Sequence, residues 1–73
     1  MTMTAKQKEL WDIADAEIRV IGVARLNRDP QMRAAAKIEG SKIWALNEAL
    51  GAARGVMPED DECQKLIDAI REG

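Results

Sequence analysis

The sequence predicts an all-α protein, built as an antiparallel helical hairpin with a short third helix, and three observations support this. Apolar residues recur at the three- and four-residue spacing of amphipathic helices through most of the chain. Strand-like alternation never persists, and phenylalanine and tyrosine, which favour strands, are absent from the sequence. Helix start and stop signals occur at three places. The 73 residues are expected to form a single helical domain, residues 1–73.

The first helix is expected over residues of about 4–27. Thr4 and Gln7 stand at the spacing of a capping box, in which each side chain satisfies a free backbone amide of the other residue. No proline interrupts this segment. Gly22 weakens the helix through its backbone freedom, but it is not expected to end it.

A second helix is expected over residues of about 30–54, and a short third helix over about 58–71. Asp29 and Pro30 provide an N-cap and a proline at the first helical position, and Gly55 provides the stop signal. The third helix begins at Pro58 with four acidic residues, 59–62, at the positive end of its dipole. It then carries one apolar stripe, which consists of Cys63, Leu66, Ile67 and Ile70.

The apolar faces of the two long helices are wider than a single hairpin can cover. On a helical wheel they span roughly 240° and 200°, whereas an ordinary surface helix needs little more than ~100°. Two hairpins packed as a four-helix bundle would cover both flanks, so the sequence predicts a homodimer. The alternative is that the third helix folds back and covers part of this surface within one chain. The residues assigned to the dimer interface or core are Leu10, Trp11, Ile13, Ile18, Val20, Ile21, Ile38, Ile43, Leu46 and Leu50.

Glu17 lies near the middle of the apolar arc of the first helix, which is an unusual place for a charge. In a hairpin that turns near residues 28 and 29, Glu17 would face residues 39–42, and Lys42 is its expected ion-pair partner. We favour a buried polar pair that fixes helix register. A catalytic carboxylate would need a companion group and a cleft, and the sequence indicates neither.

Trp44 is the residue expected to contact a protein partner. On the wheel it lies roughly 150° from the centre of the apolar arc of the second helix, among charged and small polar residues. Tryptophan and arginine are over-represented among interface hot spots. The alternative is that Trp44 packs in the dimer interface or under the third helix. The residues predicted to bind the partner are Trp44, Arg33, Lys37, Ser41, Asn47 and Glu48.

The sequence offers no complete catalytic, metal-binding or cofactor-binding motif, so we expect no enzyme activity, no metal and no cofactor. Histidine is absent, and the acidic run at 59–62 lacks the alternating ligands and the glycine turn of a calcium loop. Cys63 lies on an apolar stripe, which favours a buried thiol over a nucleophile. A lone cysteine also fits a reducing, cytoplasmic compartment.

Charge and hydropathy make two further partners unfavourable. The net charge is −2, and acidic and basic residues are interspersed along most of the chain, so no broad basic field is available for nucleic acid. No run of about 18 apolar residues is present, and the polar first residues do not resemble a signal peptide, so we expect neither a membrane span nor a leader.

In size and predicted architecture, residues of about 4–55 resemble the small helical-hairpin anti-activators that bacteriophages and other mobile elements encode. The resemblance rests on the hinge at Asp29-Pro30, the surplus apolar surface and the outward Trp44. Proteins of that class bind host quorum-sensing transcription factors or pilus-assembly ATPases. The resemblance implies a homodimer that occupies a functional surface of a host protein, with Trp44 and its basic neighbours as contacts.

We therefore expect a small non-enzymatic regulator that inhibits or sequesters a host protein, such as a transcription activator, by occluding its surface. Two alternatives stay open. A DNA-binding regulator of the antitoxin type would show an affinity for duplex DNA that falls steeply as salt rises. A structural or assembly module would have no soluble host target.

Overall fold

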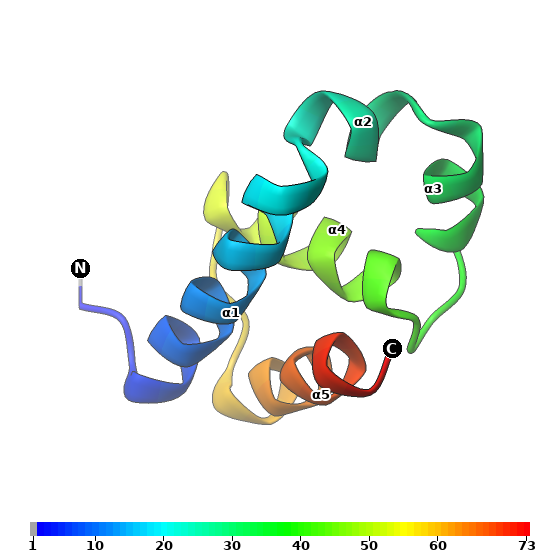
Figure 1. Ribbon diagram of the computed structural model, residues 1–73. Coiled ribbons are helices and arrows are strands. Elements are labelled where there is room, and N and C mark those ends of the chain that lie inside the picture. Colours follow the sequence, from blue (N-terminus) through cyan, green and yellow to red (C-terminus); the bar gives the residue numbers. More distant parts are fainter. Residues whose placement is uncertain (1) are drawn as a thin grey trace.

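The computed structural model describes residues 2–73, and within this range the chain is all-α, with no strand. None of the helices described is both long and apolar enough to cross a membrane. The fold therefore belongs to the class that the sequence predicts, although its helices are divided differently (Figure 1). The helices are α1 (Ala5–Ile21), α2 (Val23–Arg28), α3 (Pro30–Ala35), α4 (Lys42–Ala53) and α5 (Asp60–Glu72).

Helices α1, α4 and α5 form the body of the protein, and α5 packs against both of the others. The short helices α2 and α3 pair with each other at one end of the molecule, on the side of α4 that lies away from α5 (Figure 1). Helix α5 supplies more buried residues than any other helix. The buried core consists of Leu10, Ala14, Ile18, Leu26, Ala45, Leu46, Ala49, Cys63, Leu66, Ile67, Ala69 and Ile70.

The start of α1 confirms the predicted capping box. The backbone N–H of Gln7 donates to the Thr4 hydroxyl oxygen at 3.1 Å, and the backbone N–H of Thr4 donates to Gln7 Oε1 at 2.9 Å. Two of the free amides at the helix start are thereby satisfied.

The prediction of one continuous helix over residues 4–27 is wrong, because the helix is broken at Gly22. This residue has a φ of 93°, which only glycine adopts at little cost, and it ends α1 and begins α2. The N–H of Gly22 still donates to the carbonyl of Ile18 at 2.7 Å, and its own carbonyl accepts from the N–H of Leu26 at 3.0 Å. The backbone bonds are thus preserved while the chain changes direction.

The continuous second helix expected over 30–54 is also wrong. Asp29 caps α3 as predicted, but α3 ends at Ala35, and the chain turns through Gly40, whose φ is 90°. Ser41 then caps α4: its hydroxyl accepts from the N–H of Trp44 at 3.1 Å and donates to the carbonyl of Ala35 at 2.9 Å. One side chain therefore both closes the turn and starts the next helix.

The third helix is confirmed, and it begins at Asp60 rather than at Pro58. All four residues of its predicted apolar stripe are buried, and they contribute to the core between α1 and α4. In place of a two-helix hairpin with a peripheral third helix, the structure has a three-helix core in which α5 is central. Much of the apolar surface that predicted a bundle dimer is therefore covered within one chain.

The residues assigned to the dimer interface or core divide into three groups. Leu10, Ile18 and Leu46 are buried. Val20 and Ile38 are 84% and 61% exposed, so they lie outside the core of the single chain. The remaining ones are partly buried and pack against the core, namely Trp11, Ile13, Ile21, Ile43 and Leu50.

We expect Ile67→Ala to lower the free energy of unfolding by about 2–5 kcal/mol, because it leaves a cavity where α5 contributes to the core between α1 and α4. Val20→Ala, which truncates a residue that is 84% exposed on α1, should change it by less than about 0.5 kcal/mol. Urea denaturation followed by circular dichroism measures both. Similar losses from the two variants would contradict this description of the core.

Candidate functional site

Helix α4 lies between the α2–α3 pair and α5 (Figure 1). A cleft lies on each side of this helix. The exposed side chain of Asn47, in the middle of α4, lines both clefts. The two clefts are therefore neighbours on one surface, although they are built from different helices. Their charges have opposite signs.

The basic cleft, between α2, α3 and α4, has a volume of about 250 Å³. Arg33 and Lys37 provide its charge, and both are exposed. Neither forms an ion pair with a carboxylate within residues 2–73. Two cations beside two side-chain amides suit an anionic group such as a carboxylate. The cleft is lined by Leu26, Asn27, Arg33, Ala36, Lys37 and Asn47.

The acidic cleft, between α4, α5 and the link that joins them, has a volume of about 420 Å³. Glu48 and Glu62 provide its charge, and neither has an ion-pair partner in the described chain. Val56, on the link, is 90% exposed at this cleft. The lining consists of Asn47, Glu48, Gly51, Ala52, Val56, Pro58, Glu62 and Leu66.

A third concave surface, the apolar groove, lies where the start of the chain passes the end of α4. Met3 is 42% exposed there, and Met57 and Trp11 are partly buried. Methionine side chains adapt readily to different apolar partners. The groove is lined by Met3, Trp11, Ala52, Ala53, Gly55 and Met57, with Thr2, Gln7 and Val56 at one end.

Trp44 is partly buried and packs against the core rather than pointing freely outward. The ammonium group of Lys65 lies 5.5 Å from the centre of its ring, within cation–π range. Lys65 also pairs with Glu39 at 2.9 Å, and this hydrogen bond and the charge of Glu39 raise the pKa of Lys65. Trp44 therefore lies beside Lys65 of α5, and it does not line either charged cleft.

The structure brings together only some of the residues predicted to bind a partner. Arg33, Lys37 and Asn47 meet at the basic cleft, and Glu48 lies at the acidic cleft. The hydroxyl of Ser41 caps α4 and lines neither charged cleft. Sequence reasoning did not identify Asn27 or Glu62 as cleft residues, because α2 and α5 approach α4 only in the folded chain.

The predicted ion pair between Glu17 and Lys42 is confirmed, with 3.0 Å between Glu17 Oε2 and Lys42 Nζ. The sequence predicted a buried pair, and this was wrong: the side chains of Glu17 and Lys42 are 38% and 31% exposed. It joins α1 to the first residue of α4. A half-exposed pair contributes little to stability, but its geometry is consistent with a role in setting how α1 and α4 meet.

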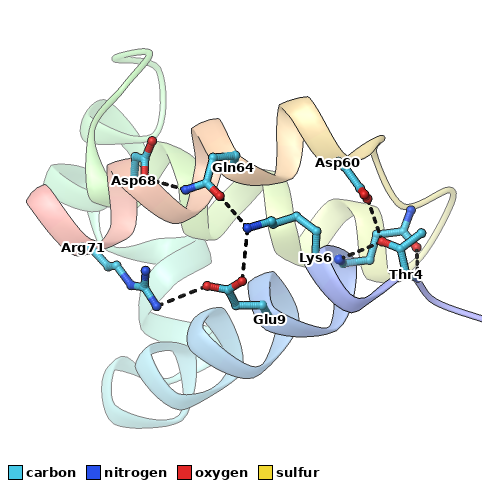
Figure 2. Close-up of polar contacts among 8 residues, drawn as sticks. Thr4, Lys6, Glu9, Asp60, Gln64, Asp68 and Arg71 are labelled. Carbon is cyan, nitrogen blue, oxygen red and sulfur yellow. Dashed lines mark hydrogen bonds and ion pairs between the residues drawn. The ribbon is translucent and has the colours of Figure 1, made fainter.

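A polar network on the surface joins α1 to α5 (Figure 2). Lys6 Nζ lies 2.6 Å from Gln64 Oε1 and 3.4 Å from Glu9, and Arg71 reaches Glu9 at 3.3 Å. The Thr4 hydroxyl donates to Asp60 at 2.7 Å. These polar groups bond to one another across the two helices, so we interpret the network as a structural contact that holds α1 against α5.

Cys63 is confirmed as a buried thiol. Its Sγ lies 3.4 Å from the carbonyl oxygen of Pro58, to which it can donate. Burial raises the pKa of the Cys63 thiol, and the nearby carboxylates of Asp60 and Glu62 raise it further. A raised pKa disfavours the reactive thiolate. Within residues 2–73, no group of three or more cysteine, aspartate or glutamate side chains is placed to hold a metal ion.

Comparison with known proteins leaves these surfaces without a precedent. No protein-family model, no curated protein and no solved structure matches the chain. The resemblance to phage-encoded anti-activators therefore stays a prediction from size and helical architecture.

Proposed function

We propose that the protein is a small, non-enzymatic regulator that binds a host protein and inhibits or sequesters it by occluding its surface. In this proposal the basic cleft holds an acidic segment of the host protein, and the outer face of α4 extends the contact. An origin in a phage or another mobile element would fit this role and the resemblance given above.

The observation that carries the proposal is the unpaired charge of the basic cleft. Seven of the eleven lysines and arginines form ion pairs, and Arg33 and Lys37 are the two without a carboxylate partner in the described residues that line one cleft together; Arg28 and Arg54 also form no ion pair but line neither charged cleft. The two cations line the same cleft, so their like charges repel each other. A bound carboxylate would relieve this repulsion, and the planar fork of arginine suits a carboxylate group.

The acidic cleft makes duplex DNA a less suitable occupant. Glu48 and Glu62 lie on the other side of Asn47, next to the basic cleft. An extended phosphate backbone that filled the basic cleft would meet these carboxylates, and like charges would repel. A short acidic peptide segment can enter the basic cleft without reaching them.

To test the proposal, tagged wild-type protein and the double variant Arg33→Glu, Lys37→Glu are used to capture partners from a bacterial lysate. We expect one stoichiometric protein partner with the wild type and its loss from the variant, because the reversed cleft repels carboxylates. The matched control is Arg28→Glu, Arg54→Glu, which changes the net charge equally at exposed cations outside both clefts. Equal capture by all three proteins, or release of the partner by nuclease, would contradict the proposal.

Trp44→Ala tests whether the tryptophan contributes to the same contact. We expect affinity for the captured partner to fall by about 2 kcal/mol or more, which is the scale of an interface hot spot. Trp44→Phe, which keeps an aromatic ring under Lys65, is the control for packing. Isothermal titration calorimetry gives the affinities, and far-ultraviolet circular dichroism reports folding. Unfolding of Trp44→Ala, or an unchanged affinity, would show that Trp44 is not a partner contact.

A further inference from the structure

We propose that the chain forms a two-fold dimer in which the basic cleft of each copy receives the acidic cleft of the other. The occupant is thus a second copy of this chain. The inference shares the basic cleft with the proposed function, but it rests on a separate observation, which is that two clefts of opposite charge lie side by side on α4.

The two clefts carry complementary charges. Arg33 and Lys37 have no carboxylate partner in residues 2–73, and Glu48 and Glu62 have no cationic partner there. Each cleft therefore presents two charges of one sign that nothing within the described chain neutralises by a direct contact. In a dimer, the two cations of each basic cleft can therefore pair with the two carboxylates of the acidic cleft of the other copy.

The arrangement of the two clefts suits a two-fold axis. The sign of the charge changes across Asn47, which lines both clefts. A rotation of 180° about an axis that passes near this exposed side chain exchanges the two clefts, so each basic cleft faces an acidic one. Two-fold interfaces are self-complementary in this way, and a contact made once is made twice. The Asn47 amide can both donate and accept, so the two copies can hydrogen-bond at the axis.

Exposed apolar side chains stand on the two segments that flank α4. Ile38 follows Lys37 in the chain and is 61% exposed, and Val56 lines the acidic cleft and is 90% exposed. When the clefts face each other, the second copy covers the exposed Val56 at each acidic cleft, at both ends of the interface. This apolar contact adds affinity, and the charges fix the register and reject other arrangements.

The dimer leads to a specific consequence for the proposed function. A second copy and an acidic segment of a host protein would compete for the same basic cleft. The dimer would then be a closed form of the regulator, and dilution or an acidic partner would open it.

Sedimentation equilibrium of the purified full-length chain tests the dimer. At low ionic strength we expect a mass near twice the 8.1 kDa of one chain, and dissociation as salt screens the charges. The variants Arg33→Glu, Lys37→Glu and Glu48→Lys, Glu62→Lys each place like charges in both contacts. Each should weaken self-association by at least about tenfold.

Mixing the two variants is the decisive measurement. In the mixed pair both contacts regain opposite charges, so we expect an equimolar mixture to form a dimer that neither variant forms alone. The control Arg28→Glu, Arg54→Glu should dimerise like the wild type. A wild-type chain that stays monomeric up to about 1 mM, a mixture that stays monomeric, or assembly beyond two copies would overturn the inference. A wild-type chain that forms the dimer but captures no host protein would overturn only the proposed function.

Discussion

The structure depends on the apolar stripe of α5, whose residues contribute to the core between α1 and α4. Cys63, Leu66, Ile67 and Ile70 are all buried there, and α5 contacts both of the other long helices. A chain of 73 residues can bury only a small core. Helix α5 covers the apolar faces of two helices at once, so its packing decides whether the chain folds alone. With these faces covered, charged side chains line the two clefts beside the middle of α4. The acidic cleft is in this sense a consequence of where α5 packs, because Glu62 and Leu66 of α5 line it.

The sequence predicted the helical class, the capping box at Thr4 and the buried stripe of α5, because each depends on residues within one or two helical turns. The Glu17–Lys42 pair was also predicted correctly, because α1 meets the start of α4 even though the two long helices are broken. The breaks at Gly22 and Gly40 were missed. Apolar periodicity continues on both sides of each glycine, so the same pattern fits a continuous helix and a bent one. Only the positive φ separates the two, and the sequence does not record it.

The charged clefts could be predicted only in part. Arg33, Lys37 and Asn47 were assigned to one face of a single long helix, and the structure brings them together across the turn at Ser41. Glu62 was interpreted as part of an acidic helix start, which is a common pattern with a local explanation. Its position opposite Glu48 follows from how α5 packs on α4. Trp44 was placed on an outer face, but the breaks in the chain bring it against the core and beneath Lys65.

The central claim is that α5 belongs to the same cooperative unit as α1 and α4, while α2 and α3 form a less protected end. Native-state hydrogen exchange tests this claim most directly. We expect amides of Leu66, Ile67 and Ile70 to exchange only with global unfolding, together with those of Ala14 and Ala45, and amides of α2 and α3 to exchange at lower free energy. Exchange of the α5 amides while α1 and α4 stay protected would contradict the account, because α5 would then be an accessory to the core.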